Sequence, residues 1–106
     1  MTRPYVYLWE FIVEPDHREE FEREYGPRGA WVALFGQAPG YLGTLLLRDA
    51  ADAGRFVTVD RWQSAEAYRA FRAGFARQYA ELDARCGNLT VTETALGSFD
   101  EVIPGA

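Results

Sequence analysis

The sequence predicts an α+β domain in which two main helices cover one face of a four-stranded antiparallel sheet. Three observations predict this class: four strand-like runs rich in aromatic and β-branched residues, a short charged helix after the first run, and a long amphipathic helix before the last. A length of 106 residues fits one domain. We therefore expect a single domain over residues 1–106, with its core at about 5–97 and a tail at 98–106.

The first strand is expected at residues 5–13, where the run YVYLWEFIV is rich in aromatic and β-branched types. Pro15 ends this strand because proline has no amide hydrogen to donate to a sheet. Asp16 follows, with Glu19 three residues later, and this spacing predicts an N-cap and a capping box. The first helix should then continue to about Tyr25 and bury only a narrow apolar stripe.

Gly26 and Pro27 should end this helix, since a glycine followed by a proline is a typical helix stop. Residues 28–36 are expected to form a short second helical segment or an ordered turn. The runs at 41–49 and 55–62 have the composition of the second and third strands, and a small polar loop joins them. These two strands should therefore pair as a hairpin.

Ser64 is predicted to cap a long helix that ends at Gly87. Within it, apolar side chains recur at steps of three and four residues, which is the helical period. This stripe consists of Tyr68, Phe71, Phe75, Tyr79, Leu82 and Cys86. Gly74 lowers the helix propensity and predicts either a kink or a close packing contact. The last strand is expected at residues 88–97.

The resulting order of strands and helices is that of the ferredoxin-like arrangement. The first strand is apolar on both faces, because Tyr7 and Trp9 alternate with Val6 and Leu8. Two helices can cover only one face, so the other would remain as a large apolar patch. We therefore expect a homodimer in which an identical partner covers that face. The alternative is a monomer that tolerates the exposed patch.

Composition excludes several classes of partner. The formal charge of −5 and the lack of a basic run argue against nucleic acid or an anionic membrane as a partner. Cys86 is the only cysteine, so an intramolecular disulfide or a cysteine metal site is not expected. The first residues lead into a strand-like run without a signal-peptide core, and no apolar stretch reaches membrane-spanning length. We expect a cytoplasmic protein without a metal.

Three carboxylates, Glu10, Asp60 and Glu93, lie among apolar residues on predicted strands. A carboxylate on a covered sheet face either pairs with arginine or keeps a raised pKa suited to acid–base chemistry. The available partners on predicted strands are Arg48, Arg55 and Arg61. Ion pairs in the dimer interface are the favoured interpretation.

Residues 59–71, VDRWQSAEAYRAF, combine a strand that ends in tryptophan with a serine-capped helix that begins Glu-Ala-aromatic. The positions that carry this pattern are Trp62, Ser64, Glu66, Ala67 and Tyr68. The segment resembles one that is typical of the antibiotic biosynthesis monooxygenase-like family of dimeric α+β barrels. The turn Pro39-Gly40-Tyr41, with Gly43 after it, also resembles the turn into that family's second strand. In the order of its elements the resemblance covers about residues 5–97.

The resemblance implies a barrel-forming homodimer with a pocket on the helix side of each sheet. Members of the superfamily include oxygenases that form quinones from polycyclic phenols without a metal or organic cofactor. In such enzymes the bound phenol or anthrone loses a proton, and the resulting anion itself reduces O₂. The protein supplies a pocket that excludes water and a few hydrogen-bonding groups. No cofactor is therefore expected.

Haem-degrading members of the superfamily resemble the chain less. They use an asparagine on the first strand, with a tryptophan and a histidine on the last helix. The nearest positions here hold Trp9, Phe71, and Tyr79 or Glu81, so none of the three residue types is reproduced. Many relatives also place a histidine where Phe71 stands, and the most obvious base is therefore absent.

The leading hypothesis is a cofactor-independent monooxygenase that acts on a hydrophobic aromatic small molecule of the phenol, anthrone or quinol type. The candidate catalytic residues, for hydrogen bonding or proton transfer, are His17, Tyr25 and Trp31. The candidate pocket residues are Trp9, Trp62, Tyr68, Phe71, Phe75 and Tyr79. For His17, the only histidine, the simpler interpretation is a solvated side chain on a charged helix, and for the aromatic stripe it is core packing.

Two other functions remain open. A non-catalytic dimeric small-molecule-binding or stress-related protein would have the same fold, and a cavity filled by its own aromatic side chains would favour it. Ring-cleaving or isomerising chemistry on lactones would need an inward acid–base pair, such as Glu10 with Arg61 or Asp60.

Overall fold

One four-stranded antiparallel sheet, in the order β2-β3-β1-β4, organises the computed structural model, which describes residues 3–104. The strands are β1 (Tyr5–Ile12), β2 (Tyr41–Arg48), β3 (Arg55–Trp62) and β4 (Thr92–Asp100). The chain passes from β1 through helices to the β2–β3 hairpin, and from β3 through helices to β4. This topology confirms the predicted ferredoxin-like α+β fold.

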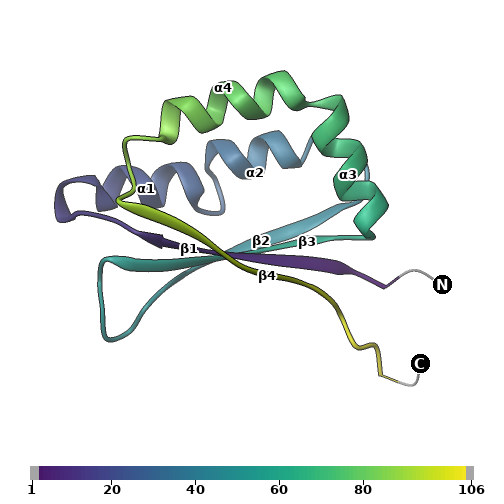
Figure 1. Cartoon of the computed structure of the whole chain (residues 1–106), viewed down its shortest axis with the longest axis horizontal. Helices are drawn as coiled ribbons and strands as arrows, with labels where there is room; N and C mark the ends of the chain where they lie inside the picture. Colours follow the sequence, from purple (N-terminus) through teal and green to yellow (C-terminus); the bar gives the residue numbers. More distant parts are fainter. Residues whose placement is uncertain (1–2, 105–106) are drawn as a thin grey trace.

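All helices lie on one face of the sheet, and the other face carries none (Figure 1). After β1 come the 3₁₀ helix η1 (Pro15–His17), α1 (Arg18–Tyr25) and α2 (Ala30–Phe35). After β3 come α3 (Ala65–Gly74) and α4 (Ala76–Cys86). No helix within residues 3–104 is long and apolar enough to cross a membrane.

The central strand β3 alternates strictly between buried and half-buried residues. Its buried side chains, Phe56, Thr58, Asp60 and Trp62, face the helices, because residues two apart share one face of a strand. Two of these four are polar, which is unusual for the covered face of a sheet. The sheet therefore holds polar groups under the helices at its centre.

The register shifts once in β2 and once in the β1–β4 ladder, and a glycine lies close to each shift. Gly43 has φ of 146° and Gly97 has φ of 145°, which are values that other L-residues rarely adopt. Both shifts have the form of β-bulges, which bend a strand and change which way its side chains point. After the bulge in β2, Thr44 lies opposite Asp60.

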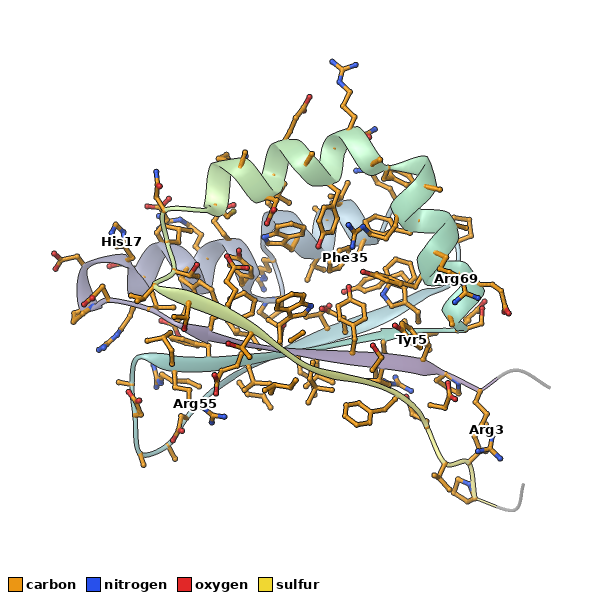
Figure 2. The ribbon with its side chains drawn as sticks, in the orientation of Figure 1. Arg3, Tyr5, His17, Phe35, Arg55 and Arg69 are labelled. Atoms are coloured by element: carbon orange, nitrogen blue, oxygen red, sulfur yellow. The ribbon has the colours of Figure 1, made fainter. Side chains whose placement is uncertain are left out.

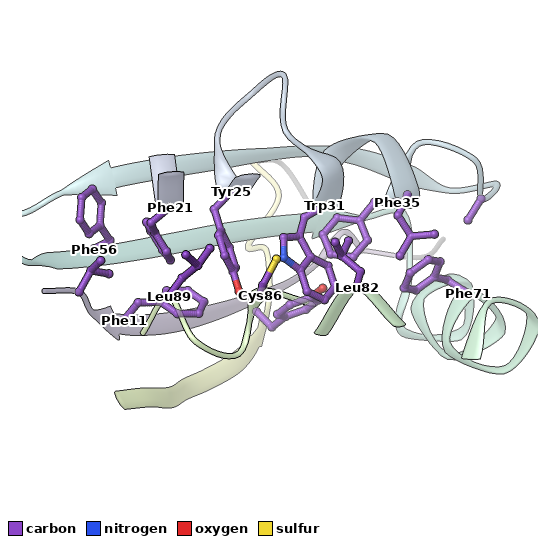
Figure 3. Close-up of a cluster of buried hydrophobic side chains, with 14 of the residues drawn as sticks. Phe11, Phe21, Tyr25, Trp31, Phe35, Phe56, Phe71, Leu82, Cys86 and Leu89 are labelled. Carbon is purple, nitrogen blue, oxygen red and sulfur yellow. The ribbon is translucent and has the colours of Figure 1, made fainter. Parts of the chain in front are cut away.

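Packed aromatic rings form much of the core between the sheet and the helices (Figure 3). Phe21 stacks on Tyr25 with a centroid separation of 4.3 Å, and both rings contact Phe11 from β1. At the other end, Trp62 and Phe71 lie 5.1 Å apart. The aromatic residues at 68–79 thus form one wall of this core, as their helical spacing indicates.

The predicted capping box at Asp16 is wrong. The chain forms the 3₁₀ helix Pro15–His17 first, and α1 begins at Arg18 with His17 as an N-cap that makes no side-chain capping bond. Proline is favoured in a first helical turn, so the turn begins one residue before Asp16 and encloses it.

The single long helix predicted after Ser64 is in fact two helices. Ser64 does cap the first, since its hydroxyl accepts a hydrogen bond of 3.1 Å from the amide of Ala67. The break comes at Phe75, with φ of −119° and ψ of 24°, directly after Gly74. A side chain at position 74 would meet open space, so the glycine accompanies a kink and not a close contact.

The last strand begins at Thr92 and ends at Asp100, so it lies later than the predicted 88–97. Leu89 belongs to the preceding loop, where its side chain is buried in the core. The strand extends to Asp100 because it pairs with β1 as far as Tyr5. Part of the predicted tail is therefore sheet.

Candidate active site

A cavity of about 300 Å³ lies between the helices and the middle of the sheet. The sheet contributes to its lining Tyr7, Trp9, Phe11, Thr44, Thr58, Asp60 and Glu93. The helices contribute Tyr25, Trp31, Phe35, Arg72, Tyr79 and Asp83. A volume near 300 Å³ is at the lower end of that of small-molecule sites, and aromatic walls with a few polar groups are typical of them.

The aromatic wall is held by the helices that cross the sheet. Trp31 on α2 meets Tyr79 on α4 edge to face, with ring centroids 5.1 Å apart, and lies 5.9 Å from Tyr25 on α1. The indole Nε1 of Trp31 is buried without a hydrogen bond of good geometry and faces the Tyr25 hydroxyl and the Cys86 thiol (Figure 3). Burial raises the pKa of Tyr25, so its phenol stays protonated at neutral pH.

Asp60 supplies the buried carboxylate of the cavity, with only 5% of the residue exposed. The Thr44 hydroxyl donates a hydrogen bond of 2.5 Å to its Oδ1. Because Thr44 has one hydroxyl hydrogen, the Tyr41 hydroxyl must be the donor in the 2.6 Å contact between Tyr41 and Thr44. Burial raises the pKa of Asp60 to about 6, although Thr44 and the nearby Tyr7 hydroxyl lower it.

A charged rim, formed by Arg72, Asp83 and Glu93, completes the lining of the cavity, and all three residues are exposed. The Arg72 guanidinium carbon lies 3.9 Å from the centre of the Tyr79 ring, which is a cation–π distance, and one of its nitrogens donates 2.9 Å to the Tyr68 hydroxyl. Burial raises the pKa of Tyr79 to about 12, while the positive charge of Arg72 opposes that rise.

The other strand arginines also have acidic partners within the chain. Arg48 lies 3.5 Å from Glu22 of α1, whereas Arg55 and Arg61 pair on or beside the face that carries no helix. Arg55 donates 2.7 Å to Glu10, and Arg61 donates 2.6 Å to Glu101. Glu10 therefore has an arginine partner within the chain. Asp60 forms no ion pair with any residue of the described part, so the ion-pair interpretation does not extend to it.

Four of the predicted pocket or catalytic residues line the cavity, namely Trp9, Tyr25, Trp31 and Tyr79. The other predicted pocket residues lie beside it. Trp62 and Phe71 are fully buried in the core, and Tyr68 packs on Trp62. Phe71 and Phe75 line a second hollow of about 240 Å³ near Gly40.

His17 is not among the residues that line the cavity. It ends η1, half-buried, at the far end of the molecule from Tyr5, and its backbone amide donates 3.0 Å to the Glu14 carbonyl (Figure 2). The proton-transfer role suggested for His17 stays a prediction.

Sequence reasoning did not identify Thr44, Thr58, Arg72 and Asp83 as cavity residues. Thr58 and Asp60 lie on the same face of β3 as Trp62, because residues two apart in a strand share a face. The alternation along that strand could therefore have indicated that both side chains face the helices. Thr44 is placed by the bulge at Gly43, which leaves no clear pattern in the sequence. Within residues 3–104 no three His, Cys, Asp or Glu side chains are grouped as a metal site.

A family model for antibiotic biosynthesis monooxygenases matches residues 4–81. No curated protein matches the sequence significantly. The solved structures that share the fold include a protein from Nitrosomonas europaea provisionally described as such a monooxygenase. That match has a TM-score of 0.74 and 17% identity, and covers 100% of this chain and 97% of that one.

Two other solved structures extend the comparison. PA3566 from Pseudomonas aeruginosa has a TM-score of 0.74 and 19% identity, and the match covers 97% of this chain and 98% of that one. SnoaB, a cofactor-independent oxygenase from Streptomyces nogalater, has a TM-score of 0.71 and 21% identity, and the match covers 97% of this chain and 99% of that one. At these identities the structures establish a shared fold over nearly the whole chain.

Proposed function

This chain belongs to the antibiotic biosynthesis monooxygenase family, and from that premise we propose that it is a cofactor-independent monooxygenase acting on a hydrophobic aromatic small molecule. The substrate class is a phenol, anthrone or quinol. The observation that carries the proposal is the cavity of about 300 Å³, which combines aromatic walls with the inward carboxylate of Asp60. A non-catalytic binding protein would need the walls but not a buried acid–base group.

In this reaction the protein needs only to position the substrate and to accept a proton from it, because the substrate anion itself reduces O₂. An anthrone loses a proton from the methylene between its rings, and the delocalised anion donates electrons to O₂. Over the whole reaction, R₂CH₂ and O₂ give R₂C=O and H₂O, so the substrate is the only reductant. Trp9, Tyr25, Trp31 and Tyr79 would hold the flat rings and keep water away from the anion.

The direct test is oxygen consumption by the purified protein with anthrone and with a quinol. We expect protein-dependent O₂ uptake, with one oxygen atom of ¹⁸O₂ recovered in the anthrone-derived quinone by mass spectrometry. Heat-denatured protein is the control, because anthrones also oxidise slowly in air. Tight binding of anthrone without faster uptake would support the non-catalytic ligand-binding alternative and contradict the monooxygenase.

We also propose that two chains associate through the sheet face that carries no helix (Figure 2). Leu45 and Leu47 on β2, with Phe99 on β4, expose 58%, 48% and 53% of their surface. The pairing register places Leu45 opposite Val59 on this face. A two-fold axis would bring the same patch of each chain together, and a stable interface needs about 800 Å² from each partner.

Replacing Leu45 by glutamate should convert the dimer into a monomer, because the new charge would have to be buried without a partner. Sedimentation velocity should give twice the 12.0 kDa chain mass for the unaltered protein and the single chain mass for the variant. Ala80→Glu, on the exposed side of α4, is the matched control and should stay dimeric. An unaltered protein that sediments as a monomer would refute the proposed dimer.

A further inference from the structure

Asp60 is the only buried charged residue of the described chain, and its surroundings do not neutralise it. The other carboxylates that line the cavity, Asp83 and Glu93, are exposed on the rim. Burying an unpaired carboxylate costs free energy, so a purely structural role would favour an uncharged residue here. The presence of a carboxylate at position 60 is therefore better explained by a chemical role in the cavity than by a structural one.

The hydrogen bonds around Asp60 hold its carboxylate in place at the cavity. The Tyr41 hydroxyl donates to Thr44 and Thr44 donates to Oδ1, which fixes the plane of the carboxylate. The Tyr7 hydroxyl also lies beside the carboxylate and, like Thr44, lowers its pKa as a hydrogen-bond partner. Because Asp60 lines the cavity, a ligand hydroxyl there can reach it.

We propose that Asp60 is the catalytic base of this site and removes the acidic hydrogen of the bound aromatic substrate. The inference rests on the proposed monooxygenase function and adds the group that starts it. In this step the Asp60 carboxylate gains an O–H bond as the substrate O–H or C–H bond breaks, and the electron pair of that bond stays on the substrate. The proton later leaves with the oxygen atom that becomes water, and Asp60 is again ionised.

The charges around the cavity favour this acceptor over bulk water. Titratable and charged groups line the cavity or lie next to its lining residues on six elements besides β3. They are Tyr7 on β1, Tyr41 on β2, Tyr25 on α1, Tyr68 and Arg72 on α3, Tyr79 and Asp83 on α4, and Glu93 on β4. The cavity lining already holds three carboxylates, Asp60, Asp83 and Glu93, and one cation, Arg72. If the proton left the cavity, the substrate anion would add another negative charge to this site. Transfer to Asp60 keeps the net charge constant, and Arg72 is placed to attract the anion.

The ionisation of Asp60 suits this task. Burial raises the pKa of its carboxyl to about 6, so the group is mostly ionised at pH 7 to 8 but close enough to hold a proton briefly. A base with a pKa near the working pH transfers protons most effectively. Thr44 opposes the rise in pKa and is therefore a positioning and tuning residue.

Ligand binding tests the proposal without relying on turnover. The probe is 2-naphthol, a neutral phenol over about pH 5 to 8, with 2-methoxynaphthalene as its matched ether without a donor hydrogen. By titration calorimetry, we expect the affinity of 2-naphthol to fall about tenfold as the pH drops through about 6, because a hydrogen bond to an ionised carboxylate is lost. The ether should not lose affinity over this range. Asp60→Asn should abolish the dependence for 2-naphthol.

Thr44→Val provides a second variant, one that keeps the Asp60 carboxylate and removes its hydrogen-bond donor. Loss of the hydrogen bond that lowers the pKa of Asp60 should move the midpoint of 2-naphthol binding to higher pH. A merely structural role for Thr44 would weaken binding at all pH values and leave the midpoint in place. A pH-independent affinity of the unaltered protein, or an unchanged midpoint in Thr44→Val, would overturn the assignment.

Oxygen uptake separates this proposal from the proposed function. With an anthrone substrate, Asp60→Asn should lower kcat by about a hundredfold or more with a small change in KM. Uptake that survives Asp60→Asn unchanged would overturn Asp60 as the base and leave the monooxygenase in place. No uptake by any variant, together with the pH-dependent naphthol binding, would overturn the monooxygenase and support Asp60 as the group that accepts the ligand's hydrogen.

Discussion

Replacing Trp62 by alanine should lower the free energy of unfolding by about 3 to 5 kcal/mol, the largest effect on stability expected of a single substitution in this chain. Trp62 is fully buried at the end of β3. Its ring lies within 6 Å, between centroids, of Phe35, Tyr41, Tyr68 and Phe71. These four neighbours come from α2, β2 and α3, so alanine would leave a cavity where the sheet meets α2 and α3.

A small domain has a total stability of about 5 to 15 kcal/mol, so this loss is a large fraction of it. Urea unfolding followed by circular dichroism gives the difference directly. Trp9→Ala is the matched control, because Trp9 is half-buried and its replacement should lower the free energy of unfolding clearly less. Equal losses for the two variants would contradict the assignment of Trp62 to the core.

The same tryptophan shows how a sequence pattern can indicate a fold without defining a site. Trp62 and Tyr68 mark the junction of β3 and α3. As predicted, β3 ends at Trp62 and Ser64 caps the helix that follows. The two side chains were also candidate pocket walls. The structure places Trp62 wholly inside the core, because a residue at the end of a central strand meets the helix that follows it.

Local signals predicted the elements well where one propensity dominated. The strands at 41–48 and 55–62 and the helix stop at Gly26 fall within a residue of expectation. The prediction failed where tertiary contacts decide, as in the break between Gly74 and Phe75. The apolar period continues across that break, so the sequence pattern alone did not show where α3 ends.

The centre of the candidate site was the least predictable part. Asp60 looked like one of three strand carboxylates with arginines within reach, and an ion pair was the simplest interpretation. The difference between Glu10 and Asp60 is one of face, because Glu10 lies on the side without helices and meets Arg55 there. The alternation of side chains along β1 and β3 distinguishes the two carboxylates only after the helix-covered face of the sheet is known.

Asp60 should also make the stability of the protein depend on pH in a direction opposite to that of an ordinary surface carboxylate. Burial raises its pKa from a usual value of 3.8 to about 6 in the folded protein. The folded state therefore holds this proton over a pH range in which the unfolded state has released it. The corresponding stabilisation is complete below about pH 4 and is lost as the pH rises through about 6.

A difference of about two pKa units corresponds to about 3 kcal/mol of unfolding free energy. Asp60→Asn removes the ionisable group and keeps an oxygen that can accept from Thr44. At pH 7 the variant should therefore be more stable than the unaltered protein by up to about 3 kcal/mol, whereas at pH 4 the two should be nearly equal.

Urea unfolding of both proteins at several pH values between about 4 and 8 measures this difference, and every other carboxylate cancels because both chains carry it. Asp83→Asn, on the exposed rim, should show no such trend. Parallel curves for Asp60→Asn and the unaltered protein would show that the carboxylate is not strained by burial. A rise in stability on removing Asp60 would instead mean that the fold carries this charge at a cost, as proteins do for groups that act on a ligand.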